Sequence, residues 1–211
     1  LYYTVFGIEC LRALRLDLPV PRILPYLESF GIGDDLDFVH RACLARCWAH
    51  MPAEKQTSLD KEGLSKNILA HRSADGAFDN KIAGKTGTVY ASFLALGALQ
   101  DLQVSLNDPE RLIEVIHKLK AKDGGYANQA SMPMGLTPPT TAAVAIFHQL
   151  GESIDPETGQ WLLSRHYGEG GFFATPMAPV PDLLSTATAL HALAIMKVSN
   201  ELVKEPCLDF I

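Results

Sequence analysis

A short phrase of an acidic residue, a glycine, a small residue and an aromatic residue occurs three times in this chain. The copies read Asp75-Gly76-Ala77-Phe78, Asp123-Gly124-Gly125-Tyr126 and Glu169-Gly170-Gly171-Phe172, and their acidic residues are 48 and 46 positions apart. Repetition with a period of roughly 20–50 residues is typical of proteins built from supersecondary units that pack on their neighbours. The spacing therefore constrains the fold more than any other feature does.

The stretches that precede the glycine phrases are amphipathic. Residues 107–110 read Asn-Asp-Pro-Glu, which is a helix start with a capping side chain, a proline in the first turn and an acid at the positive end of the dipole. Residues 155–157 repeat the pattern, and residues 204–206 are expected to open another helix. Charge on one side and apolar residues on the other predict outer helices at a solvent boundary.

The stretches that follow the phrases are almost free of charge. Residues 89–99, 140–147 and 186–195 are rich in Ala, Leu and Thr, and His191 is their one titratable group apart from tyrosine. A helix that is apolar all round is expected to be buried all round, so we predict inner helices. The same alternation predicts inner helices over 1–16 and 36–50 and outer helices over 20–30 and 58–72.

The chain is therefore predicted to be all-α, with about ten helices in roughly five hairpins. The glycines fit left-handed C-caps after the outer helices. Strict alternation of two helix classes favours a curved or closed α/α barrel over a flat bundle.

The composition of the chain limits which classes of partner it is expected to bind. The net charge is −6, no Lys/Arg-rich run occurs and no apolar run is long enough for a membrane span, so neither nucleic acid nor a transmembrane segment is expected. Four cysteines in 211 residues indicate reduced thiols in a cytoplasmic protein. Because Leu1 is not Met and the first residues already read as helix, we expect one domain over 1–211 that is a fragment of a longer chain.

The glycine phrases and the helices after them resemble the prenyltransferase/squalene-cyclase repeat, which occurs in protein prenyltransferases and class II terpene cyclases. The resemblance covers 58–211 well and the first 57 residues loosely. It implies an α/α toroid whose inner helices surround an apolar, isoprenoid-binding cavity. Six hairpins are expected in a full ring, so this ring is expected to be incomplete.

The resemblance also implies where a zinc site would lie, and there the chain departs from the family. Zinc-dependent members use an Asp-x-Cys pair and a His in an Asp-x-x-His-Thr pattern at the starts of inner helices. This chain has Asp182 and Ser185 in the second pattern, and Pro138 and Thr140 in the preceding helix. Hydroxyls and prolines do not replace imidazole and thiolate as zinc ligands, so zinc is not expected. Asp182 and Ser185 stay candidates for ligand binding.

Asp34, Asp35 and Asp37 are the nearest match to the acidic motif of class II cyclases, although their spacing differs. One interpretation makes them N-caps of the helix that follows. The other makes them catalytic, as a cluster with one raised pKa that donates a proton or binds the magnesium of a diphosphate.

His191 and Tyr90 are further candidates. His191 is interpreted either as a satisfied core histidine or as a catalytic group that lines the cavity. Tyr90 is either a packing residue or a ligand-binding hydroxyl.

His40, Cys43, Cys47 and His50 fall on one side of a helix, which suggests either a packing face or a ligand stripe. The apolar loops 132–139 and 175–181 suit a lid or a partner surface, or are plain connections. Gly84-Lys85-Thr86 lacks the upstream glycine and the strand of a phosphate-binding loop.

The sequence thus predicts a prenyltransferase- or terpene-cyclase-like toroid with a cavity for an isoprenoid or another lipid-like ligand, with its reaction unassigned. The alternative is a non-catalytic repeat scaffold that binds a protein partner. Exposed inner faces at the ends of the chain are expected to favour self-association.

Overall fold

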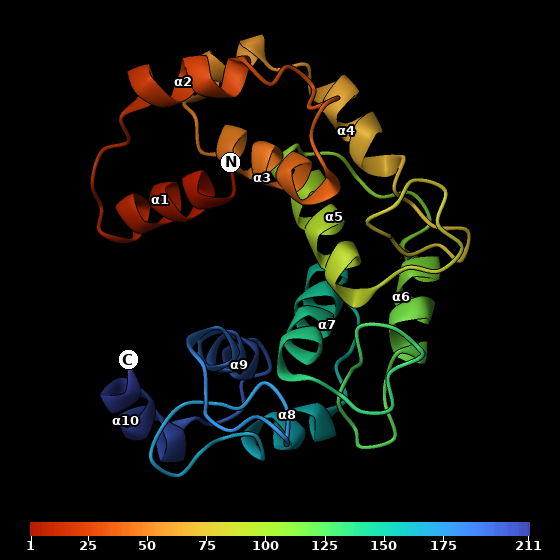
Figure 1. Cartoon of the computed structure of the whole chain (residues 1–211), viewed down its shortest axis with the longest axis vertical. Helices are drawn as coiled ribbons and strands as arrows, with labels where there is room; N and C mark the ends of the chain where they lie inside the picture. Colours follow the sequence, from red (N-terminus) through yellow and green to blue (C-terminus); the bar gives the residue numbers. More distant parts are fainter. The chain divides into compact units, whose positions relative to one another are not determined.

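The computed structural model describes Leu1–Ile211 and contains ten α-helices, one 3-10 helix and no strand, only isolated bridges. The all-α prediction is therefore confirmed. The α-helices are α1 (Tyr2–Ala13), α2 (Val20–Glu28), α3 (Phe38–Ala49), α4 (Lys61–Leu69), α5 (Val89–Asp101), α6 (Pro109–Lys118), α7 (Thr137–Leu150), α8 (Pro156–Leu163), α9 (Leu183–Ile195) and α10 (Glu201–Phe210) (Figure 1). The 3-10 helix covers Ala53–Ser58. None of the helices is long and apolar enough to span a membrane.

The chain divides into two compact units. Unit 1 comprises residues 1–87 and 94–108, and unit 2 comprises residues 88–93 and 109–211. The boundary falls within α5, whose first turn and a half belongs to unit 2.

Unit 1 is organised around α3, which contacts α1, α2 and α4. Each of the four helices contributes fully buried side chains, among them Ile8, Leu27, Trp48 and Leu64. Asp37 accepts a hydrogen bond from the backbone N–H of His40 and Asp60 accepts one from that of Gly63, so both carboxylates cap helix starts. The capping interpretation is thereby confirmed for Asp37.

Unit 2 is organised around α7 and α9, which pack side by side, with α8 against both (Figure 1). Its core joins α7, α8, α9, α10 and the third glycine phrase through buried residues: Val144, Trp161, Leu162, Phe172, Ala189, Ala192, Leu193, Val203 and Cys207. The outer helix α6 buries Leu112, Val115 and Ile116 and exposes Lys118, as its amphipathic pattern predicts.

The three glycine phrases form three turns with the same backbone hydrogen bonds. We call 73–78, 121–126 and 167–172 the first, second and third glycine turns. In each, the first residue's N–H donates to the carbonyl four residues later: Ser73 to Ala77, Ala121 to Gly125 and Tyr167 to Gly171. Gly76, Gly124 and Gly170 have φ of 104°, 94° and 118°, a region that favours glycine.

Several details differ from the sequence-based expectations. The glycines lie beyond the C-caps of the outer helices, which are Ala70 after α4 and Ser164 after α8. The loop predicted over 132–139 is shorter, because Thr137 and the two prolines after it form the first turn of α7, where missing N–H groups cost nothing. Pro206 lies inside α10 rather than at its start.

Candidate functional site

Helix α9 is not buried on every side, contrary to the prediction for an inner helix. One face packs into the core of unit 2 through Ser185, Thr186, Ala189, Ala192 and Leu193. The opposite face is exposed. This open face of α9 consists of Leu183, Leu184, Ala187, His191 and Ala194, with Leu183 and Leu184 exposed to 60% and 63%. An inner helix thus presents an apolar surface without a partner in its unit.

The same repeat positions are accessible at the other inner-helix segments of unit 2. Tyr90 and Phe93, at the start of α5, are exposed to 41% and 40%. On α7, Pro138, Ala142 and Ala145 are half-buried. The repeat spacing aligns Tyr90 with Pro138 and Leu184. The accessible face is therefore a recurring feature, made of apolar and small side chains.

His191 is exposed, so its interpretation as a core histidine is wrong. The repeat spacing aligns it with Gly97 and Ala145. It is thus an imidazole at a repeat position where the other repeats carry the smallest side chains. Comparing the repeats position by position would have singled it out from the sequence.

Tyr90 is anchored at its backbone. Its N–H donates to Oδ1 of Asn128 over 2.9 Å, and the Val89 N–H donates to the Asn128 carbonyl over 3.1 Å. This arrangement fixes the start of α5 next to the loop that follows the second glycine turn.

Asp182 and Ser185 are hydrogen-bonded to each other. Asp182 is the N-cap of α9: its Oδ1 accepts from the Ser185 N–H over 2.8 Å, and its Oδ2 accepts from the Ser185 hydroxyl over 2.8 Å. Ser185 is buried. Both groups are engaged in holding the helix start, which fits a capping pair better than a ligand site.

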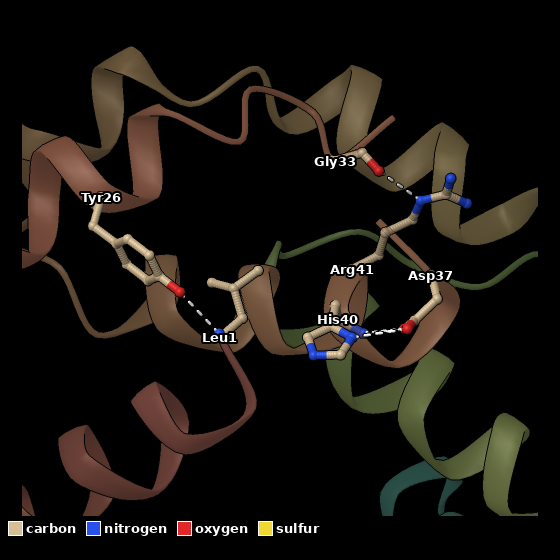
Figure 2. A network of polar contacts seen from close by, with 6 residues as sticks. All are labelled: Leu1, Tyr26, Gly33, Asp37, His40 and Arg41. Carbon is tan, nitrogen blue, oxygen red and sulfur yellow. Dashed lines mark hydrogen bonds and ion pairs between the residues drawn. The ribbon is translucent and has the colours of Figure 1, made fainter. Parts of the chain in front are cut away.

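In unit 1, neighbouring side chains form hydrogen bonds with the acidic segment 34–37 and with the residue before it. Both oxygens of Asp37 lie 2.9 Å from Nδ1 of His40, and Arg41 donates from Nε to the Gly33 carbonyl over 2.8 Å (Figure 2). Asp34 accepts from the Asn67 amide over 2.9 Å. The backbone hydrogen bond from His40, aided by its side chain, holds the pKa of Asp37 below its usual value, which does not favour Asp37 as a proton donor.

The stripe of two histidines and two cysteines on α3 does not form a ligand set. Burial raises the pKa of the Cys47 thiol to about 12 and also raises that of Cys43, so both stay protonated. No group of three or more His, Cys, Asp or Glu side chains lies close enough together to hold a metal ion. The absence of stoichiometric zinc stays a prediction.

His50 belongs instead to a charge network that the sequence analysis missed. Its Nε2 lies 2.9 Å from Glu9, and Arg46 lies 3.3 Å from Glu9 and 2.6 Å from Asp101. Burial raises the pKa of Asp101, and Arg46 opposes that rise. These residues lie on α1, on α3 and its C-cap, and on α5, and no local sequence signal pairs them.

The candidate residues thus fall into two groups. Asp34, Asp35 and Asp37 lie in unit 1, where only Asp34 and Asp37 have side-chain partners. The second group lies in unit 2: Tyr90, Asp182, Ser185 and His191. In the loop before α9, Met177 is 81% exposed and Val180 65%, as expected for an apolar loop; its role as a lid stays a prediction.

Comparison with known proteins gives the family. No curated protein matches the chain. Among solved structures it is similar to Candida albicans protein geranylgeranyltransferase-I complexed with GGPP, with a TM-score of 0.62 and 18% sequence identity, which supports a common fold. The match covers 79% of this chain and 50% of that one, so the chain spans about half the length of its structural relative. The prenyltransferase alpha-alpha toroid domain family matches residues 31–173 and 156–211, and the chain belongs to that family.

Proposed function

We propose that the inner-helix faces of this toroid domain bind an isoprenoid or another lipid-like ligand. The observation that carries the proposal is the open face of α9, where two leucines and two alanines are exposed on a helix whose opposite side is core. Fully burying a leucine side chain is favourable by about 1.5–3 kcal/mol. An apolar ligand that covers this face gains that free energy.

The chemistry of the face favours a ligand with little charge along its body. The accessible positions carry Leu184 and Ala187 on α9 and Tyr90 and Phe93 on α5, with no Lys, Arg, Asp or Glu among them. The structural relative from Candida albicans was solved with GGPP, an isoprenoid diphosphate, which supports the same class of ligand here.

Within this proposal, His191 is the hydrogen-bonding group that meets an oxygen of the ligand. Asp182 and Ser185 position the start of α9 rather than contact the ligand, because each already satisfies the other. The proposal assigns no reaction, and magnesium would enter only with a diphosphate ligand.

A binding titration with a fluorescent isoprenoid alcohol tests the proposal, with unlabelled geranylgeraniol as competitor. Ala187→Glu places a carboxylate on the open face of α9 and is expected to weaken binding by tenfold or more, because the apolar ligand would desolvate the charge. The matched control is Gln160→Glu, at an exposed position on α8, which is expected to leave binding unchanged.

Saturable binding that Ala187→Glu leaves intact would contradict the site. No binding of any isoprenoid by the unmodified protein would contradict the function and favour the scaffold that binds a protein partner.

A further inference from the structure

Unit 1 contains a cleft that the proposed function does not use. Its volume is about 590 Å³. It is lined by the end of α1, the connection to α2 and the end of α3, through Arg12, Leu16, Asp17, Leu18, Val20, Ala49, His50, Met51 and Pro52. The volume lies within the roughly 300–1,000 Å³ of small-molecule sites.

A tight turn after α1 shapes one wall of the cleft. The Arg15 N–H donates to the Arg12 carbonyl over 2.9 Å, and the Leu16 N–H donates to the Leu11 carbonyl over 2.8 Å. Arg15 adopts a left-handed φ of 57°, which reverses the chain. The turn places Leu16, Asp17 and Leu18 next to the end of α3.

Two opposite charges line the cleft without neutralising each other. Arg12 and Asp17 take part in none of the six ion pairs of the structure, so their charged atoms lie more than 4.0 Å apart. Their side chains also make none of the hydrogen bonds that the structure contains. The third polar lining residue, His50, has its Nε2 engaged by Glu9.

The remaining lining is apolar. Leu16, Leu18, Val20, Met51 and Pro52 form the walls, with Met51 buried. A guanidinium binds a carboxylate in a two-pronged geometry, and a carboxylate accepts from an ammonium group. A ligand with both groups and an apolar body would satisfy every part of this lining.

We propose that this cleft binds a small zwitterion with an apolar body, either a free apolar amino acid or a short apolar peptide, with its carboxylate on Arg12 and its ammonium on Asp17. A fatty acid would leave Asp17 facing a carboxylate or an alkyl chain. A diphosphate would find only one unpaired cation. The open sides of the cleft and the exposed charges suit an exchangeable ligand rather than a permanently bound one.

Saturation-transfer NMR titrations with four probes test the proposal. L-Leucine and L-leucyl-L-leucine carry both charges and distinguish the two sources of the zwitterion. N-Acetyl-L-leucine lacks the ammonium group, and L-leucinamide lacks the carboxylate. At least one zwitterion is expected to bind tenfold or more tightly than either singly charged probe, because each lost charge removes a charge-assisted hydrogen bond.

Two variants of the cleft and two control variants are titrated with the same probes. Arg12→Gln is expected to lower the affinity for the zwitterion to that for leucinamide. The affinity for leucinamide itself is expected to stay unchanged. Asp17→Asn is expected to lower the affinity for the zwitterion to that for N-acetylleucine. The controls Arg15→Gln and Glu28→Gln change exposed charges that do not line the cleft, and both are expected to bind like the unmodified protein.

Three results would overturn the proposal: no saturable binding of either zwitterion, N-acetylleucine binding as tightly as the zwitterions, or equal losses in the control variants. None of these results depends on isoprenoid binding in unit 2, so the two proposals fail separately.

Discussion

The second and third glycine turns share their backbone hydrogen bonds and differ in their side-chain links. They also differ at the residue after the first glycine, where Gly171 has a positive φ of 82° and Gly125 does not. In the second turn, Oδ1 of Asp123 accepts from the N–H of Gly125 over 3.3 Å and from that of Gly135 over 3.1 Å, which joins the turn to the segment before α7. In the third turn the acid is Glu169, whose Oε2 accepts from the Tyr167 hydroxyl. The position that corresponds to Gly135 is Pro181, which has no N–H to donate.

The basic residue that follows each outer helix shows the same difference. Arg72 donates to the carbonyls of Asn107 and Asp108 at the start of α6, and Lys120 pairs with Asp155, the N-cap of α8. The repeat spacing aligns both with His166, whose buried Nε2 has no hydrogen-bond partner. The third repeat lacks both links.

Packing against α10 replaces these links in the third turn. A Cβ atom added to Gly170 would lie 2.2 Å from the Pro206 carbonyl oxygen, and one added to Gly171 would lie 3.0 Å from the Phe210 ring. Hydrogen bonds through an aspartate fix the first two turns, since Asp75 accepts from the N–H groups of Ala77 and Gly87 as Asp123 does from those of Gly125 and Gly135. The second turn also packs closely on a helix, because a Cβ atom added to Gly125 would lie 2.4 Å from the Trp161 ring of α8. The third turn has close packing on α10 without the aspartate links. Turns with the same backbone hydrogen bonds thus differ in whether an aspartate links them to the next inner helix.

The strongest test compares alanine at equivalent glycines. Gly170→Ala is expected to cost about 3 kcal/mol or more, because the backbone strain at its φ adds to an overlap with a backbone oxygen that cannot move aside. Gly124→Ala has similar strain, but its nearest neighbour is the Trp161 ring at 3.6 Å, so about 1 kcal/mol is expected. Denaturant unfolding measures both, and equal costs would refute the role of α10.

The inner helices should show no such difference. Ala143 on α7 and Ala189 on α9 are equivalent by the repeat spacing, and both are fully buried. Changing either to leucine is expected to cost about 1–3 kcal/mol by overpacking. The control Lys118→Leu, on the exposed side of α6, is expected to change stability by less than about 0.5 kcal/mol. Unequal costs in the two alanine variants would extend the difference between the repeats to their cores.

The sequence predicted the hairpins and their turns because both leave local signals. Apolar periodicity separates outer from inner helices, and a glycine before an aromatic residue marks each turn. The open face of α9 left no such signal, because a uniformly apolar helix reads the same whether one side or every side is packed. The Arg46 network could not be predicted because Glu9 and Asp101 lie 37 and 55 residues away from Arg46 in the sequence.

Replacing the acidic residue of the second or the third glycine turn by alanine tests the role of the aspartate hydrogen bonds. Asp123→Ala is expected to cost about 1–2 kcal/mol, because two backbone N–H groups lose a carboxylate acceptor. Glu169→Ala is expected to cost less than about 0.5 kcal/mol, because an exposed glutamate loses one tyrosine contact. Thermal unfolding at neutral pH measures both, and the comparison fails if Glu169→Ala is the more damaging.

Asp182 extends the comparison to the helix starts and also tests for zinc. Asp182 caps α9, whereas the equivalent Leu136 gives α7 no side-chain cap. Asp182→Ala is expected to cost about 1 kcal/mol through the lost cap. Elemental analysis is expected to find no stoichiometric zinc in either protein. One zinc per chain, lost together with an activity in the variant, would instead make Asp182 a metal ligand.

His166, whose buried Nε2 has no hydrogen-bond partner, should produce the smallest effect, a shallow dependence of stability on pH. Burial holds the pKa of His166 below its usual value of 6.5, so the unfolded chain binds more protons than the folded chain just below pH 6.5. By linkage, stability from this group is present above pH 6.5 and is lost as the pH falls through the lowered pKa. His166→Gln is expected to reduce the loss of stability between pH 7 and pH 5 without abolishing it, because burial also lowers the pKa of His71, which stays in place. Denaturant midpoints measured across that range for both proteins check the sign. A variant with an unchanged slope would show that the pKa of His166 is the same in the folded and the unfolded chain and would contradict the prediction.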